Sequence, residues 1–155
     1  MSVYQGDQPG PVAEAFHSVT DGQTLQPTQV VVVQDGPVPV RLEVLLEQLA
    51  ARPDVTLVRL PRNRGLDGAL NAGLAACRYE VVARQDADDV STPQRFALTV
   101  PLVADGTWDV VGGALREFQP QPPVVGRLAG GGGGAGGGLG GNAPDRGAGG
   151  GTAGG

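Results

Sequence analysis

The residues best suited to chemistry form the acidic run 84–89, Arg-Gln-Asp-Ala-Asp-Asp, which follows the apolar segment 79–83. We expect segment 79–83 to be a strand, and side chains on a strand alternate between its two faces, so Asp86 and Asp88 would project to the same side. Two neighbouring carboxylates repel each other unless a cation lies between them. Mg²⁺ and Mn²⁺ take oxygen ligands and commonly bind together with phosphates. The run therefore predicts a site for a metal-bound diphosphate.

Other interpretations of the acidic run remain open at this point. An acidic triplet on its own is most often a solvated loop or a helix cap. A calcium loop of the EF-hand type is a poor match, because the sixth position counted from Asp86 is Ser91 rather than glycine, and the twelfth is Ala97 rather than glutamate. The position of the run within the fold has to decide between the solvated loop and the metal site.

Composition divides the chain into two parts. Of its 27 glycines, 17 lie between residues 126 and 155. A glycine-rich segment of this kind cannot bury enough apolar surface to offset its chain entropy. We therefore predict one domain over residues 1–119 and a Pro/Gly-rich disordered tail over residues 120–155.

Charge and hydropathy exclude several classes of function. The net charge of −5 argues against a surface for nucleic acid. No apolar run of 18 residues is present, so we expect no transmembrane anchor. Cys77 is the single cysteine, which fits a reducing compartment. We expect a cytoplasmic protein, peripheral at the membrane through its partners.

The order of apolar segments predicts an α/β fold. Segments rich in valine, expected to be strands, alternate with segments whose apolar residues recur at helical spacing. This alternation predicts a mostly parallel sheet with helices on both faces. The expected strands are 1–4, 30–33, 55–60, 79–83 and 108–111. The expected helices are 11–20, 40–51, a third from near Asp67 to Cys77, and a fourth that begins at Pro93 with Ser91 or Thr92 as its cap. One face of the third helix would carry Leu66, Leu70, Leu74 and Cys77.

Polar residues follow four of the expected strands. The carboxyl ends of strands are where open α/β sheets bind their ligands. Loop residues at strand ends are polar in most proteins, but the concentration of carboxylates at two of the four ends favours a phosphate-binding site. The four clusters are Tyr4, Gln5 and Asp7; Gln34, Asp35 and Gly36; Arg62, Asn63 and Arg64; and Asp86, Asp88 and Asp89.

Five motifs, in this order along the chain, resemble those of family 2 glycosyltransferases. The resemblance covers residues 1–119 and implies a GT-A type, Rossmann-like fold that is incomplete in this chain. The motifs are 1–7, like the opening strand and loop; 30–36, like the second strand; 63–73, like an asparagine–glycine helix segment; 83–89 with Pro93 and Arg95-Phe96, like the Asp-x-Asp region; and 109–113, like the strand that comes next.

The resemblance implies a site for a nucleotide-diphospho-sugar donor, with a UDP-sugar as the expected compound. By this analogy Ser2 and Tyr4 lie beside the nucleotide, and Asp35 binds its base or ribose. Arg64 approaches the base or the diphosphate, and Asp86 faces the ribose or the metal.

The resemblance also implies a reaction. Asp88 is the main ligand of a divalent cation, Mn²⁺ or Mg²⁺, and Asp86 is the second metal-site residue. The cation would neutralise the departing diphosphate while the hydroxyl of a glycan or lipid-linked acceptor attacks the sugar. Most relatives invert the anomeric centre with a carboxylate general base.

The chain departs from this resemblance at both ends. Met1 falls within the expected first strand, and the resemblance stops near Gln119, before the family's base loop and acceptor-binding region. No catalytic base is therefore assigned, and we expect a truncated and inactive enzyme, with either a truncation or a frameshift near Pro120 to Gly126.

Two alternative functions are kept. One is a non-catalytic nucleotide-binding fragment. The other is a metal-dependent nucleotidyltransferase, which is disfavoured because the loop 6–10 lacks the basic residue expected after the first strand.

Overall fold

Three valine-rich segments form the centre of the fold. The strands β1 (Ser2–Val3), β2 (Val30–Asp35) and β3 (Val55–Leu60) make a parallel sheet in the order β1-β2-β3. In its register Ser2 lies opposite Val33, and Val30 lies opposite Val55. This computed structural model describes residues 1–117, so the predicted tail 120–155 lies outside the described residues.

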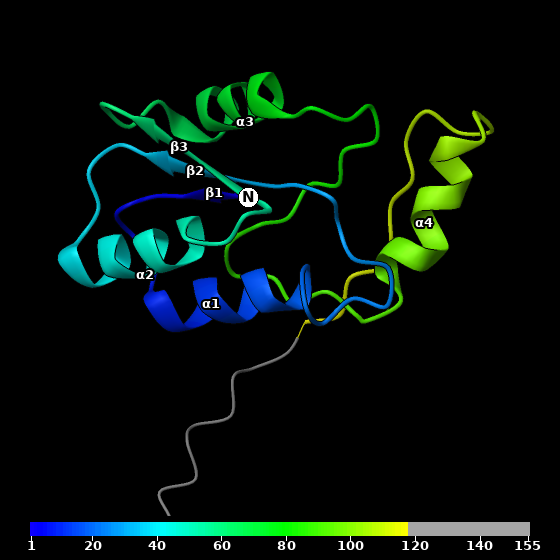
Figure 1. Cartoon of the computed structure of the whole chain (residues 1–155), viewed down its shortest axis with the longest axis horizontal. Coiled ribbons are helices and arrows are strands. Elements are labelled where there is room, and N and C mark those ends of the chain that lie inside the picture. Colours follow the sequence, from blue (N-terminus) through cyan, green and yellow to red (C-terminus); the bar gives the residue numbers. More distant parts are fainter. Residues whose placement is uncertain (118–155) are drawn as a thin grey trace, which may run out of the picture. The chain divides into compact units, whose positions relative to one another are not determined.

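Helices cover both faces of the sheet, as Figure 1 shows. The helix α3 (Gly65–Ala76) packs on all three strands from one side. The helix α2 (Val40–Ala50) packs on β3 from the other side, with α1 (Pro9–Ser18) against it. The predicted α/β fold, a parallel sheet with helices on both faces, is therefore confirmed as a small, incomplete GT-A type arrangement.

The main core lies between the sheet and the pair α1 and α2. Burying each large apolar side chain there contributes about 1.5–3 kcal/mol relative to leaving it in water. On the opposite face α3 approaches β2 closely, since a Cβ added to Gly73 would lie 3.1 Å from a methyl of Val33. The buried cluster comprises Val3, Val12, Phe16, Val30, Val32, Leu42, Leu46 and Ala87.

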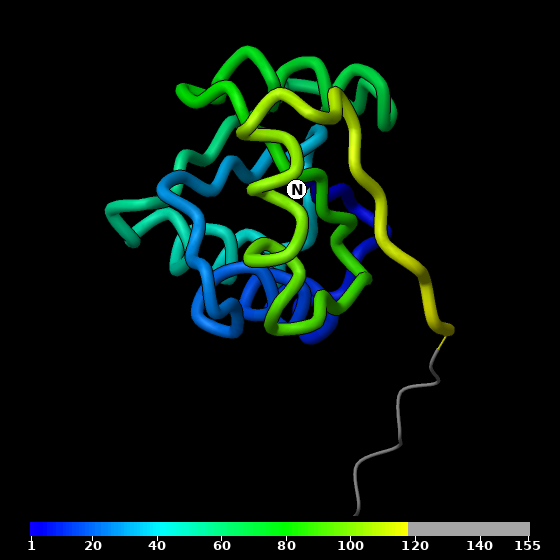
Figure 2. Tube along the Cα trace, turned by 90° about the vertical axis from the view of Figure 1, so that its right-hand side faces the viewer, coloured from blue at the N-terminus to red at the C-terminus, as the bar shows by residue number. Residues whose placement is uncertain are grey.

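The fourth helix, α4 (Arg95–Ala104), stands beside these layers in Figure 1 and in front of them in Figure 2. Its first turn is fixed by Phe96, whose ring is buried and whose N–H donates to the side chain of Gln23 at 3.1 Å. Pro101 lies inside α4 and cannot donate a helical hydrogen bond. No helix within residues 1–117 has the length and apolar character that a membrane crossing requires.

Several predictions about elements are wrong. Segments 79–83 and 108–111 are irregular rather than strands. The sheet of the described residues contains β1, β2 and β3 but not residues 79–83, which line a hollow together with Met1 and Ser2. Without a fourth strand over it, the predicted apolar face of α3 stays open, and Leu66 and Leu74 are exposed.

Helix ends also differ from the predicted ones. The helix α1 begins and ends two residues earlier than expected, and α4 begins at Arg95 rather than Pro93. Neither Ser91 nor Thr92 caps α4, because its N-cap position is Gln94. The Ser91 hydroxyl instead donates to the side chain of Gln85 at 2.8 Å.

Candidate functional site

The carboxyl ends of the three strands lie at one edge of the sheet because all the strands are parallel. The loops after β2 and β3 touch each other there. Gly36 has a φ of +83°, and a Cβ added to it would lie 2.5 Å from the backbone nitrogen of Asn63. Only glycine fits this position without strain, so the close approach of the two loops depends on it.

Asp35 ends β2 and is 4 % exposed. Its carboxylate accepts a hydrogen bond at 2.7 Å from the backbone N–H of Arg64, which immediately precedes α3. The two residues predicted to approach the base are therefore brought together. The Arg64 side chain is exposed, and its stem passes close to Gly68, where an added Cβ would lie 2.6 Å from the Cβ of Arg64.

The loop after β1 is a tight turn. The N–H of Tyr4 donates to the Asp7 carboxylate at 2.9 Å, and the N–H of Asp7 donates back to the Tyr4 carbonyl at 3.1 Å. The Tyr4 side chain covers Gly6 so closely that a Cβ at Gly6 would overlap the ring. Tyr4 is half-exposed, so its ring remains accessible at the ligand edge.

The acidic run is a turn rather than the end of a strand, which corrects the prediction that Asp86 and Asp88 alternate along an extended backbone. The N–H of Asp89 donates to the Asp86 carbonyl at 3.4 Å and closes the turn. The Asp86 carboxylate accepts two hydrogen bonds from the Arg84 guanidinium, at 3.0 and 3.1 Å. Asp88 is exposed and has no ion pair among residues 1–117.

The Asp7 carboxyl in the loop after β1 is influenced by the acidic turn. Burial raises the pKa of the Asp7 carboxyl, the hydrogen bond from Tyr4 opposes this rise, and the negative charge of Asp88 adds to it. The sequence analysis found Asp7 at a strand end but assigned it no role. The influence of Asp88 on Asp7 depends on the path of the chain and not on a local pattern.

The carboxylates at this edge of the sheet suit a divalent cation that binds together with the phosphates of a substrate. Within residues 1–117 no group of three or more metal-binding side chains is assembled. Mg²⁺ in proteins is usually held by one or two carboxylates together with substrate phosphates and water. Asp88 is exposed and supplies such carboxylate oxygens, whereas the Asp86 carboxylate is already paired with Arg84.

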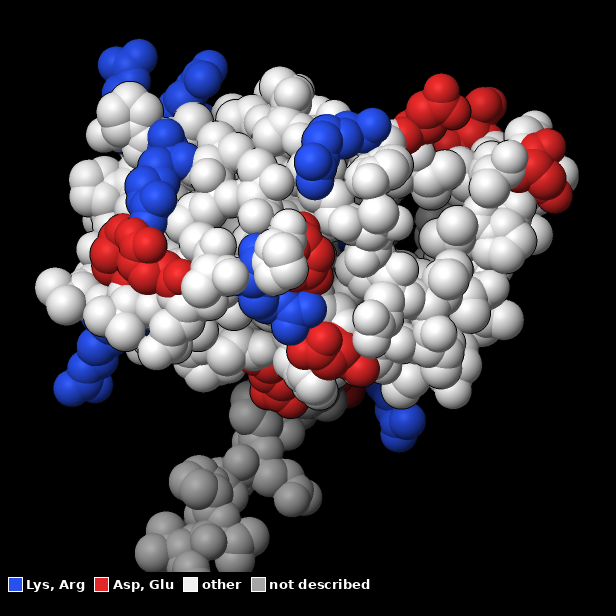
Figure 3. All heavy atoms as spheres, in the orientation of Figure 1, with Lys and Arg blue, Asp and Glu red and all other residues white. Residues whose placement is uncertain are grey.

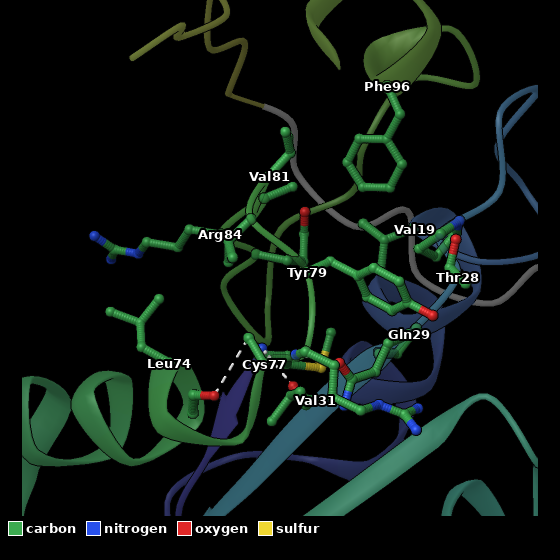
Figure 4. Close-up of a pocket in the computed structure, with 18 of the residues that line it drawn as sticks. Val19, Thr28, Gln29, Val31, Leu74, Cys77, Tyr79, Val81, Arg84 and Phe96 are labelled. Carbon is green, nitrogen blue, oxygen red and sulfur yellow. Dashed lines mark hydrogen bonds between the residues drawn. The ribbon is translucent and has the colours of Figure 1, made fainter. Parts of the chain in front are cut away.

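A hollow of about 860 Å³ lies between β1, α3 and the segment 79–85, toward the amino end of β2, whose preceding residues 25–29 also line it (Figure 4). Ser2, Arg84 and Gln85 line it, but Tyr4, Asp35, Arg64, Asp86 and Asp88 do not. Its wall is mostly apolar, and its labelled members include Leu74, Tyr79, Val81 and Phe96. Of the predicted nucleotide-binding residues, Ser2 thus faces a different space from the others.

Polar groups in the wall of this hollow are satisfied by the backbone. The Met1 amino group donates to the Val31 carbonyl at 3.0 Å, and the Cys77 thiol donates to the Gly73 carbonyl at 3.3 Å. Burial lowers the pKa of the Met1 amino group, while Cys77 and Asp86 act in the opposite direction.

Comparison with known proteins assigns the family. The model of glycosyl transferase family 2 matches residues 1–128, and the chain belongs to that family. An uncharacterized glycosyltransferase of Haemophilus influenzae is 38% identical over 119 residues, which are 76% of this chain and 44% of that protein. No solved structure matches.

Two further relatives have more specific names. The amylovoran biosynthesis glycosyltransferase AmsE of Erwinia amylovora is 35% identical over 74% of this chain and 42% of its own length. A UDP-Gal:alpha-D-GlcNAc-diphosphoundecaprenol beta-1,3-galactosyltransferase of Escherichia coli is 28% identical over 79% of this chain and 44% of its own length. The chain spans less than half the length of these relatives.

Proposed function

We propose that residues 1–119 form the donor-binding part of a glycosyltransferase and hold a nucleotide-diphospho-sugar at the carboxyl edge of the sheet. The observation that carries this proposal is the buried Asp35 carboxylate, which the Arg64 N–H holds at the end of β2, in a chain of family 2. In the neighbouring loops, the negative charge of Asp88 acts on Asp7. A cation with a diphosphate would offset their repulsion.

The residues at this edge support a division of roles. Tyr4 offers an exposed ring for contact with the nucleotide. Ser2 in β1 lines the hollow instead, and a place for it beside the nucleotide rests on the family resemblance. Asp35, fixed by the Arg64 N–H, has a second carboxylate oxygen for a hydroxyl or N–H of the ribose or base. The Arg64 guanidinium would then approach the base or the diphosphate.

Asp88 is proposed as the main ligand of Mn²⁺ or Mg²⁺, with Asp86 as the second metal-site residue. When bound, the cation would neutralise negative charge on the departing diphosphate. On the face seen in Figure 3, acidic and basic side chains are interspersed rather than gathered into one basic area. A local cation would therefore assist the binding of a diphosphate.

The complete reaction is proposed as transfer of the sugar to an acceptor hydroxyl with inversion at the anomeric carbon. The name of the E. coli relative specifies a UDP-sugar donor and a lipid-linked acceptor, which supports the same chemical classes here. We propose a UDP-sugar donor, a glycan or lipid-linked acceptor, and a cytoplasmic location at the membrane that carries such an acceptor. The family match favours this function over that of a nucleotidyltransferase.

Calorimetric titration of the full chain with UDP, with and without Mn²⁺, tests the proposal. We expect binding that requires Mn²⁺ and is abolished in Asp88→Asn. Asp86→Asn should have a smaller effect, because Asp86 already has a partner in Arg84. Glu14→Gln, on the exposed side of α1, changes the net charge equally and serves as the control.

Circular dichroism of each variant establishes that it is folded before titration. A folded wild-type chain that takes up neither UDP nor another nucleoside diphosphate in the presence of Mn²⁺ would refute the donor site. Equal losses in Asp88→Asn and Glu14→Gln would show that net charge, rather than a local ligand, determines the affinity.

A further inference from the structure

Gln85 is a buried polar residue whose side chain spans the acidic turn. It is 7 % exposed, and its amide nitrogen donates to the carbonyls of Asp86 and Asp89, at 3.2 and 2.6 Å. These are the two residues that the backbone hydrogen bond of the turn already joins. The side chain therefore reinforces the turn from inside the protein, opposite the exposed Asp88.

Arg95, the first residue of α4, donates hydrogen bonds to Gln85 and to the backbone of the segment that precedes the turn. One guanidinium nitrogen donates to the Gln85 side-chain oxygen at 2.6 Å and to the Ser91 hydroxyl at 2.8 Å. The other donates to the Arg84 carbonyl at 2.7 Å. A planar guanidinium serves several acceptors in fixed directions, which the ammonium of lysine cannot reproduce.

The same network is tied to the end of α1. The N–H of Ser91 donates to the Ser18 hydroxyl at 3.0 Å. The Gln23 amide donates to the carbonyls of Ser18 and Thr92, both at 2.7 Å. The turn is thus braced against two helices, while its Asp88 side chain remains exposed to solvent.

We propose that Gln85 and Arg95 are positioning residues that fix the Asp86–Asp89 turn, and with it Asp88, in the geometry that binds a cation and a diphosphate. Neither residue touches the ligand. This inference rests on the proposed donor site. If the turn is loosened, a smaller fraction of the molecules has the arrangement that binds the ligand. The apparent affinity for UDP in the presence of Mn²⁺ then falls in the same ratio.

The test compares two arginines that have similar surroundings. Arg95 lies over the ring of Phe96 at 5.4 Å, and Arg52 lies over the ring of Phe16 at 5.6 Å. Arg52 also serves several acceptors, the carboxylates of Asp21 and Asp54, but none of them belongs to the acidic turn. Arg95→Lys and Arg52→Lys therefore perturb comparable interactions at different places.

Two quantities are measured on the full chain, at a temperature where every variant is folded by circular dichroism. The first is UDP affinity in saturating Mn²⁺, which we expect to fall by about 10- to 100-fold in Arg95→Lys, as for other residues that orient metal ligands. The second is hydrogen exchange of the Asp89 amide, which should be faster in Arg95→Lys and unchanged in Arg52→Lys. Ser91→Ala removes one hydroxyl of the network, should show the same two effects in a weaker form, and replaces Arg95→Lys if that variant does not fold.

The outcomes separate this inference from the donor site. If the wild type binds and Arg95→Lys binds equally well with unchanged exchange, the positioning role is refuted and the donor site stands. If Arg52→Lys and Arg95→Lys weaken binding equally, the network acts only through general stability, and the inference is likewise refuted. If the wild type shows no Mn²⁺-dependent binding, the donor site fails, and the inference fails with it.

Discussion

The Asp35 carboxylate accepts a hydrogen bond from the backbone N–H of Arg64 at 2.7 Å, so the end of β2 and the start of α3 are joined by one buried acid. The N–H groups at the start of a helix have no partners within the helix. An aspartate at the end of the neighbouring strand satisfies the N–H just before α3 and fixes the loop between β3 and α3. The Asp35 carboxylate thus stabilises the loop before α3 and, in the proposed site, also faces the ligand.

This dual role can be separated by substitution. Asp35→Ala leaves the Arg64 N–H without its acceptor, and we expect it to lower the free energy of unfolding by about 1–3 kcal/mol. Asp35→Asn keeps a side-chain oxygen and should lose less. Urea unfolding followed by circular dichroism measures both variants, and an Asp35→Ala protein as stable as the wild type would contradict the structural role.

The close approach of the loops after β2 and β3 depends on Gly36. With a φ of +83° and no room for a Cβ against Asn63, Gly36→Ala should destabilise the protein by at least about 1–2 kcal/mol and displace the loop that carries Asp35. Gly10→Ala is the matched control, because nothing lies within 4 Å of the added methyl and alanine favours the helix α1. Thermal unfolding of the two variants should move in opposite directions, and equal shifts would refute the argument.

The packing of α2 against the sheet predicts that substitutions on its two sides change stability by different amounts. Leu46 on α2 is fully buried, and Leu46→Ala should cost about 2–5 kcal/mol through lost burial and the cavity that remains. Val44→Ala, on the half-exposed side of the same helix, should change stability by less than about 0.5 kcal/mol. Chemical denaturation of both gives the comparison, and similar losses would show that α2 does not face the core as described.

Arg52 joins the loop after α1 to the start of β3 through Asp21 and Asp54. Its hydrogen bonds hold the pKa of the Asp54 carboxyl below the usual 3.8, while partial burial acts in the opposite direction. A lowered pKa means that the stabilising contribution is complete above the usual value and is lost as the pH falls through the lowered one. Arg52→Met should therefore be less stable than the wild type at pH 7, and the difference should be lost as the pH falls through the lowered pKa of Asp54.

Unfolding midpoints measured from neutral to acidic pH test this prediction. Arg41→Met is the control, because Arg41 is exposed on α2 and makes no ion pair among residues 1–117. A difference between wild type and Arg52→Met that persists unchanged at low pH would show that packing on Phe16, rather than charge, supplies the stability.

The sequence predicted the parts of the fold that local patterns determine. The valine run 30–33 lies in the central strand, and the leucines of segment 40–51 form α2 almost to the residue. The strand predicted for 79–83 failed because a strand exists only when a neighbour accepts its hydrogen bonds, and no local pattern reports that neighbour. For the same reason the alternation expected for Asp86 and Asp88 was wrong.

At the candidate site, sequence patterns found the polar clusters but not their connections. Asp35 and Arg64 were placed near the same ligand, and the structure joins them directly. The bracing of the acidic turn by Gln85 and Arg95 depends on contacts between distant segments. Such contacts follow from the path of the chain rather than from spacing within one element.

The network that braces the acidic turn also bears on when the site assembles. Its hydrogen bonds from Ser91 to Ser18 and from Phe96 to Gln23 each join residues 73 positions apart, whereas β2 and β3 pair across about 25. Long-range contacts form after local ones because a larger loop must close first. On the ribosome and in refolding, the sheet would therefore exist before the ligand edge is complete, and the capacity to hold a nucleotide would be among the last properties that the chain acquires.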